Sequence, residues 1–339
     1  MGCVLAVDGG NTKTIALVAA LDGTIVGAAR GGCGDIYNAV PLDGLATAAA
    51  AARATVEATI VAALRAGNVA PADLEVAVFN MAGVDWPEDA VYWHDAMTER
   101  GFGRRVIAQN DALGVLYAAT PGATGVSVVV GTGAATGARA ANGRVWHSSF
   151  WQDEAHGSMH LGQKLLFAVY RSALGIEPPT SLTARVLEFL GVPSVEDVLH
   201  LFHNRQRPAP VTPDRLTAIL LDEAERGDEV ALRVVRDHGA TLGNIAMAAA
   251  RQVGLDGASF PLVLAGGVFR HSSSALADAI VARVRITSPD AWLVRPLVEP
   301  VAGVVVQALA LAGVIADERL RDRVISTLPA DVTLAGLPT

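Results

Sequence analysis

The chain repeats one order of strands and turns, and this repeat constrains its fold more than any other feature. Residues 3–8 form an apolar run that ends at two glycines, and two further runs follow on either side of an Asp22–Gly23 turn. The same order returns in residues 126–147, around an Asn142–Gly143 turn. Asp-Gly and Asn-Gly accept the positive φ angles of tight hairpins. A duplicated unit predicts two lobes, although two unrelated hairpins would give a similar pattern.

Length and composition agree with a two-lobed α/β protein. The chain has 339 residues, of which 51% are hydrophobic and 18% are charged. This is enough for two compact domains in which helices pack on sheets. We expect an N-terminal lobe over residues 1–112 and a C-terminal lobe over residues 113–339, with the small-residue helix near residues 301–315 returning to the first lobe.

The net charge and the N-terminal sequence favour a cytoplasmic protein with a small-molecule substrate. The net charge is −8 and no basic run appears, which argues against nucleic-acid and anionic-membrane partners. The N-terminus has neither a charged region nor the long apolar stretch of a signal peptide. We therefore expect a cytoplasmic location and no membrane span. The sequence leaves the oligomeric state open, a homodimer included.

Two glycine-rich turns are candidates for binding phosphate, one in each repeat. Glycine lets the backbone approach a phosphate closely, and successive backbone N–H groups can surround an anion. An acid at the tip of the first strand makes chemical sense as a Mg²⁺ partner. Each turn alone could be ordinary, but two at matching places could hold one polyphosphate. The candidate residues are Asp8 for the metal, Gly9, Gly10, Asn11, Thr12 and Lys13 in the first turn, and Gly131, Thr132 and Gly133 in the second.

Two more predicted strands end at residues that could act in catalysis or in nucleotide binding. Asp111 follows the apolar run 105–109, where a carboxylate could take a proton from a hydroxyl. Asp111 could instead only cap the following helix, since Asp is a favoured N-cap residue. Gly266 and Gly267 end the run 260–265 and permit close approach of a flat ring such as adenine.

The order of the motifs DGGNTK, NDALG, GTG and AGG, followed by a helix of small residues at 303–313, resembles the superfamily of actin, sugar kinases and heat-shock ATPases. More narrowly, it resembles the N-acetylglucosamine kinase-like branch that is grouped with the BadF/BadG-type ATPases. The resemblance implies two ribonuclease-H-like lobes around a central cleft, with ATP and Mg²⁺ as cofactors. It also implies that Asp111 is the general base and that Asn38 binds sugar.

One motif departs from the kinases that the chain resembles. Those kinases carry a Gly-Asp-Glu-Gly-Ser run whose acids hold sugar hydroxyls, whereas residues 152–158 here read QDEAHGS. We expect Trp151, Asp153 and Glu154 to approach the sugar from this segment. His156 and His160 have a spacing that would suit a metal on a helix, but a third nearby ligand is missing, so ordinary cleft histidines are favoured.

The expected function is ATP-dependent phosphorylation of a sugar hydroxyl, in an amino sugar such as N-acetylglucosamine or glucosamine. The alternative is an ATPase activator or a regulatory protein of the BadF/BadG group that binds a nucleotide or sugar without kinase activity. Activators of this kind hold an iron–sulfur cluster with cysteines between subunits. Cys3 lies in an apolar run and Cys33 in the expected substrate loop, so the activator hypothesis ranks second.

Overall fold

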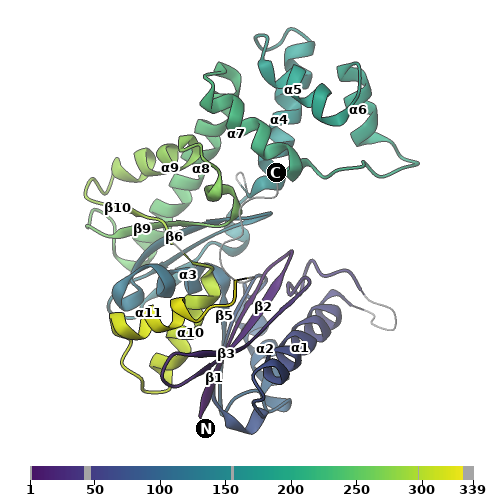
Figure 1. The fold of residues 1–339 in the computed structure, drawn as a ribbon. Helices are drawn as coiled ribbons and strands as arrows, with labels where there is room; N and C mark the ends of the chain where they lie inside the picture. Colours follow the sequence, from purple (N-terminus) through teal and green to yellow (C-terminus); the bar gives the residue numbers. More distant parts are fainter. Residues whose placement is uncertain (1, 42–46, 154–155, 297, 331–339) are drawn as a thin grey trace.

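The computed structural model describes residues 2–41, 47–153, 156–296 and 298–330, and these residues form two five-stranded sheets. The sheets lie one above the other in Figure 1, with helices around each. The order of the strands is β3-β2-β1-β4-β5 in the first sheet and β8-β7-β6-β9-β10 in the second. Each sheet therefore has three antiparallel strands followed by two parallel ones, and the duplicated unit predicted from the sequence is confirmed.

The predicted hairpins account for the antiparallel part of each sheet. Gly23 and Gly143 both adopt positive φ, at 90° and 85°, which is why these turns contain glycine. The strands of the first sheet are β1 (Cys3–Gly9), β2 (Thr14–Ala20), β3 (Ile25–Gly31), β4 (Leu74–Met81) and β5 (Arg105–Asn110). Those of the second sheet are β6 (Gly125–Val130), β7 (Ala134–Arg139), β8 (Val145–His147), β9 (Pro261–Ala265) and β10 (Trp292–Val294).

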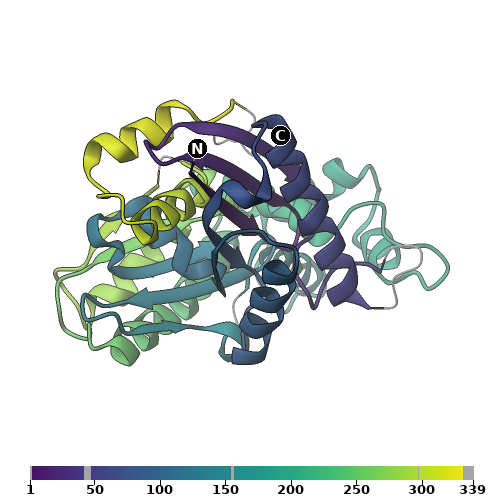
Figure 2. The same cartoon turned by 90° about the horizontal axis from the view of Figure 1, so that it is seen from below.

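The first sheet is buried on both faces, as the continuous apolar run of β1 requires. Leu5 and Val7 face one core with α1 (Ala48–Ala66) and α2 (Pro87–Glu99). Val4 and Ala6 face the opposite core with α10 (Pro300–Leu311) and α11 (Glu318–Ser326). Figure 2 shows the purple strands between the blue helix α1 and the yellow helices. The two faces follow from the alternation of side chains along a strand.

Helix α10 returns from the second half of the chain to the first sheet and crosses α3 (Asp111–Ala119) on the way. A Cβ at Gly303 would lie 2.2 Å from the backbone nitrogen of Ala118, so the crossing requires glycine there. Gln109 and Gln307 exchange two amide hydrogen bonds of 3.0 Å at the same junction. The helix returns as expected from the sequence, while the lobe boundary at residue 112 stays a prediction.

Helices α8 (Glu229–Val253) and α9 (Ala275–Arg285) belong to the core of the second sheet. The remaining helices of this half are α4 (Ser158–Ala173), α5 (Ser181–Leu190), α6 (Val195–His203) and α7 (Thr217–Glu225). In Figure 1, α5 and α6 lie at the far end, away from both sheets. Within the described ranges, no helix is both long and apolar enough to cross a bilayer.

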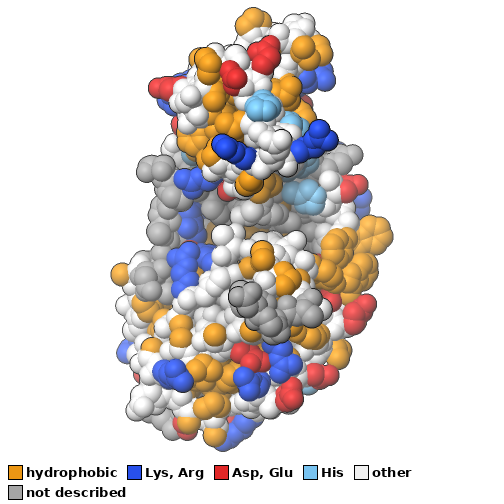
Figure 3. Space-filling model, turned by 90° about the vertical axis from the view of Figure 1, so that its right-hand side faces the viewer, with side chains coloured by type: hydrophobic (Ala, Val, Ile, Leu, Met, Phe, Trp, Pro, Cys, Tyr) orange, Lys and Arg blue, Asp and Glu red, His pale blue; other side chains and the backbone are white. Residues whose placement is uncertain are grey.

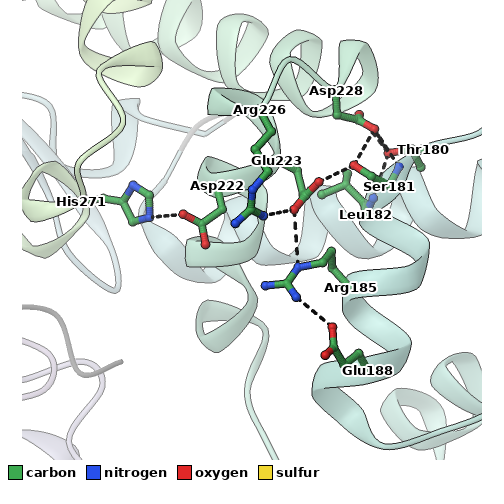
Figure 4. A network of polar contacts seen from close by, with 10 residues as sticks. All are labelled: Thr180, Ser181, Leu182, Arg185, Glu188, Asp222, Glu223, Arg226, Asp228 and His271. Atoms are coloured by element: carbon green, nitrogen blue, oxygen red, sulfur yellow. Dashed lines mark hydrogen bonds and ion pairs between the residues drawn. The ribbon is translucent and has the colours of Figure 1, made fainter.

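Polar contacts between α5, α7 and α8 fix this helical group in place (Figure 4). Asp228 caps α8 and accepts hydrogen bonds from the Ala231 backbone N–H at 2.9 Å and from the Thr180 hydroxyl at 2.9 Å. The Ser181 backbone N–H also donates to Asp228, at 2.8 Å, while the Ser181 hydroxyl donates to the buried Glu223. One acid therefore stabilises the start of two helices.

The segment after Asp317 packs against the first sheet. Leu320 and Val324 of α11 are buried in the core beneath the first sheet. The Thr327 hydroxyl accepts a hydrogen bond of 3.0 Å from the Ile25 backbone N–H on the edge strand β3. The apolar stripe of this short polar segment is hard to recognise in the sequence, because only every fourth residue faces the core.

We expect Asp228→Ala to destabilise the second half of the molecule by about 2 kcal/mol, as the loss of a multiply bonded N-cap should. Burial acts to raise the pKa of Asp228, but its hydrogen bonds outweigh burial and lower the pKa overall. The stabilisation is therefore present above the ordinary pKa of Asp and is lost as the pH falls through the lowered value. Thermal unfolding at pH 7 and pH 3 checks this, with Asp228→Asn as the matched variant. An Ala variant as stable as wild type at pH 7 would contradict it.

Candidate functional site

The two glycine-rich turns meet at the junction of the sheets. The hydroxyl oxygens of Thr12 and Thr132 lie 3.0 Å apart, although 120 residues separate them in the chain. Within the first turn the Gly10 N–H donates to the Lys13 carbonyl at 2.8 Å, and within the second the Gly131 N–H donates to the Gly133 carbonyl at 2.9 Å. The turns therefore face each other, as two turns that hold one polyphosphate must.

The second turn is supported from behind by the start of α4. The Ser158 N–H donates to the Gly131 carbonyl at 2.8 Å. A Cβ at Gly157 would lie 2.1 Å from the Gly133 carbonyl oxygen and 2.3 Å from that of Gly131. Only glycine at position 157 lets the helix approach this closely. The Gly-Ser pair retained at positions 157–158 therefore fixes the shape of the turn.

The Gly266–Gly267 pair packs against the end of β6, immediately before the second turn. Gly266 has a φ of 102°, and a Cβ there would lie 2.4 Å from the Val130 carbonyl oxygen. A 3₁₀ turn, Gly267–Arg270, follows. The sequence placed these glycines at the end of a strand, and the structure adds that they adjoin the Gly131 turn.

A buried acid that sequence reasoning missed joins both turns. One Glu299 oxygen accepts from the Lys13 ammonium at 2.9 Å and from the Arg270 guanidinium at 2.8 Å. Glu299 is only 5% exposed and directly precedes α10. A carboxylate this buried needs such partners to remain charged. The Glu299 carboxylate therefore holds Lys13 of the first turn and Arg270, which ends the 3₁₀ turn beside the second turn.

Asp8 and Asp111 lie at the carboxyl ends of β1 and β5, on the same edge of the first sheet, with β4 between them. Burial raises the pKa of Asp111 to about 7, and the charges of Asp85 and Asp35 add to the rise. Burial also raises the pKa of Asp8 to about 7; the Asp111 charge adds to this rise, while Lys13 opposes it. A carboxyl group with a pKa near 7 can accept a proton at neutral pH.

The residue that caps α3 is Asn110, not Asp111. The Asn110 side-chain oxygen accepts from the Ala112 backbone N–H at 3.1 Å. Its amide nitrogen donates to the Asp85 carboxylate at 3.1 Å and to the Val84 carbonyl at 3.2 Å. Asn110 is therefore the N-cap residue, while the Asp111 carboxylate lies in the first turn of α3, where the backbone N–H groups of Asp111 and Ala112 hydrogen-bond to it.

Two further acids missed by the sequence analysis, Asp35 and Asp85, lie near Asp111. Asp35 is 3% exposed and accepts from the Tyr37 backbone N–H and the Asn38 amide, both at 2.8 Å. Asn38 itself is exposed. Asn38 therefore lies beside the acids as expected, and it orients Asp35. Both acids could have been found from the sequence, because Asp35 is the first acid after β3 and Asp85 is the first acid after β4.

Four rings, which we call the aromatic wall, border this acidic region. Trp86 and Phe150 stack with centroids 6.0 Å apart, and Tyr37 meets Phe150 edge-on at 5.6 Å. Trp151, the fourth, lines a cavity together with Asp85. Figure 3 shows hydrophobic side chains gathered at the waist between the two halves. The structure thus places Trp151 by the acids; Asp153 is exposed, and Glu154 lies outside the described residues.

Three histidines lie close together near the start of α4. The rings of His156 and His160 lie 5.8 Å apart, and His238 lies 5.8 Å from His160. No group of three ligating side chains suited to a metal occurs in the part of the chain that is described. Burial lowers the pKa of His238 to about 3, and one of its ring nitrogens lies 2.8 Å from the His156 carbonyl oxygen.

The sequence as a whole matches a known family model. The model for the BadF/BadG/BcrA/BcrD ATPase family covers residues 5–308. The chain is also similar to an N-acetylmuramic acid/N-acetylglucosamine kinase of Clostridium acetobutylicum, with 26% identity over 194 residues. That match spans 56% of this chain and 63% of the relative's length.

Solved structures give the same two-lobed fold. A candidate N-acetylglucosamine kinase from Chromobacterium violaceum superposes with a TM-score of 0.65 and 25% identity, over 91% of this chain and 99% of the other. A ROK-family glucokinase from Streptomyces griseus, in complex with glucose and AMPPNP, superposes with a TM-score of 0.55 and 17% identity, again over 91% and 99%. The predicted fold of two actin-like ATPase lobes is confirmed.

The raised pKa of Asp111 predicts a gain in stability when the carboxylate is removed. Because the pKa in the folded state lies above the ordinary value, the folded protein binds more protons between about pH 4 and pH 7, and its stability falls as pH rises through this window. We expect Asp111→Asn to raise the apparent Tm at pH 8 by roughly 2–5 °C and to change it little at pH 4.

The matched control is Asp237→Asn, which removes an exposed carboxylate on α8. Differential scanning fluorimetry across pH 4–8 measures both variants. If Asp111→Asn were less stable than wild type at pH 8, its carboxylate would instead be stabilised by the site.

Proposed function

The chain belongs to the BadF/BadG/BcrA/BcrD ATPase family, and from this premise we propose that it transfers the γ-phosphate of ATP to a hydroxyl of a sugar. The observation that carries the proposal is the 3.0 Å contact between Thr12 and Thr132, which brings two phosphate-binding turns together near Asp111. The proposed acceptor is an amino sugar such as N-acetylglucosamine or glucosamine. The kinase relative supports this acceptor.

In the proposed complex the triphosphate lies between the two turns. The backbone N–H groups of Asn11, Thr12, Thr132 and Gly133 and the Lys13 ammonium bind its oxygens, since the N–H groups of Gly10 and Gly131 already donate within the turns. The Gly266–Gly267 pair receives the adenosine. Asp8, an oxygen donor at the strand tip, would hold Mg²⁺ directly or through water. Mg²⁺ when bound neutralises charge that develops on the transferred phosphoryl group.

Asp111 acts as the general base in this proposal. Its carboxylate accepts the proton of the sugar hydroxyl while that oxygen attacks the γ-phosphorus in line. Its raised pKa supports this role, and Asn110, not Asp111, is the N-cap of α3. Asp35, oriented by Asn38, and Asp85, oriented by Asn110, are acceptors for the other sugar hydroxyls.

The cysteines argue against the activator alternative. Cys3 is buried in β1, and Cys33 is half-buried against the core between the first sheet and α1. A cluster shared between two subunits needs thiolates at an exposed interface. An iron–sulfur absorption band in the purified protein would support the alternative.

An ADP-release screen over hexoses, hexosamines and their N-acetyl forms tests the proposal. Asp111→Asn should reduce kcat by about 100-fold or more because the base is lost, while nucleotide binding persists. In the wild type, kcat/KM should fall below about pH 7, where the Asp111 carboxyl becomes protonated. Turnover by Asp111→Asn at the wild-type rate would remove this residue from the mechanism.

Gly157→Ala should weaken nucleotide binding by roughly tenfold or more, because the new Cβ would displace the Gly131–Gly133 turn. Binding of a fluorescent ATP analogue measures the effect. Gly32→Ala is the matched control, since a Cβ there would make only an ordinary contact of 3.8 Å with Thr55. Equal affinity in the two variants would show that the second turn does not depend on α4.

A further inference from the structure

The aromatic wall has no role in the proposed phosphoryl transfer, yet its rings are unusually exposed. Trp151 is 74% exposed, Phe150 58%, Trp86 47% and Tyr37 46%. Water solvates such rings poorly, so a cluster of them on a surface indicates a binding site. The rings come from both halves of the chain: Tyr37 and Trp86 flank the first sheet, and Phe150 and Trp151 follow β8 of the second.

The aromatic wall borders a defined cavity of about 450 Å³. This volume lies within the roughly 300–1,000 Å³ typical of small-molecule sites. Polar groups share its lining with the rings: the Asp85 carboxylate, the His147 imidazole and the Ser149 hydroxyl. A cavity that combines flat apolar faces with hydrogen-bonding groups suits a ligand that has both kinds of surface.

Backbone strain at Ser149 supports a functional role for this cavity. Ser149 has a φ of 41°, in the left-handed region that residues other than glycine rarely adopt. It begins the 3₁₀ turn Ser149–Trp151, and its hydroxyl lies 2.5 Å from a His147 ring nitrogen and 3.4 Å from the Asp85 carbonyl oxygen. Strained residues of this kind persist mainly where a binding site requires them.

The cavity is directly connected to the proposed acceptor site. Asp85 lines it, and the same carboxylate accepts the 3.1 Å hydrogen bond from Asn110, the neighbour of Asp111 in the chain. The Asp85 charge also contributes to the raised pKa of Asp111. A ligand that places one hydroxyl at Asp111 can therefore extend past Asp85 into the cavity.

We propose that the cavity is a second acceptor subsite, which binds the pyranose ring next to the one that is phosphorylated. A pyranose has a face of C–H groups, which can pack on an aromatic ring, and an edge of hydroxyls, which can bond to Asp85, His147 or Ser149. The favoured acceptor is then a disaccharide of amino sugars and not the free monosaccharide. This inference rests on the proposed function, since it assigns the substrate of the same site.

The test compares N-acetylglucosamine with its β-1,4-linked disaccharide, N,N′-diacetylchitobiose, in the wild type and in Trp151→Ala. Trp292→Ala is the matched control, because Trp292 is also an exposed tryptophan, at 47%, and does not line the cavity. We expect the ratio of kcat/KM for the disaccharide to that for the monosaccharide to fall about tenfold in Trp151→Ala and to stay constant in Trp292→Ala. Phe150→Ala should act in the same direction.

An unchanged ratio in both cavity variants would overturn the subsite. So would a change in the sedimentation coefficient of Trp151→Ala without a change in ratio, which would assign this face to contact with a second copy of the chain. Calorimetric titration with the disaccharide alone separates the two proposals. Should the enzyme phosphorylate no sugar, disaccharide binding that Trp151→Ala weakens tenfold would still support the subsite, and no binding to the wild type would refute it.

Discussion

The backbone contact between α10 and α3 determines where the rest of the site lies. Gly303 lets α10 reach the backbone of α3 at Ala118, and no larger residue fits at that crossing. Helix α3 begins at Asp111 and leads to β6 and the Gly131 turn. Glu299, the residue before α10, bonds to Lys13 of the first turn. One helix crossing therefore sets the separation of the phosphate turns, the base and the buried acid.

The acids near this crossing are kept close together at a cost in stability. Asp8 and Asp111 both have pKa values near 7, so each resists ionisation at neutral pH. A fold selected for stability alone would replace them with neutral groups. Their retention agrees with a site where one carboxylate accepts a proton and another holds a cation, and it explains why Lys13 lies close to Asp8.

The duplicated sheet, both hairpins and the facing turns could be predicted because each depends on local patterns of glycine and apolar residues. Asp111 was singled out by its place after a predicted strand, and Asn38 and Trp151 through the family resemblance. Asn38 contacts Asp35, and Trp151 lines a cavity with Asp85, while the roles of all three stay predictions. Glu299 could not be found in this way, because its partners Lys13 and Arg270 come from distant segments. Asp35 was missed although its partners, the Tyr37 backbone N–H and the Asn38 amide, are local. Apart from Trp151, the rings of the aromatic wall were also missed, because single exposed rings carry no signal until the two halves bring them together.

The paired amides of Gln109 and Gln307 have a consequence for how the two halves are joined. Each side-chain amide donates one hydrogen bond to the other and accepts one from it, and neither carries charge. Changes in pH and ionic strength alter the charge and the screening of the nearby carboxylates, but they do not affect the hydrogen bonds between these two neutral amides. A change in pH that alters the charge of Asp8 and Asp111 therefore leaves β5 and α10 in the same register.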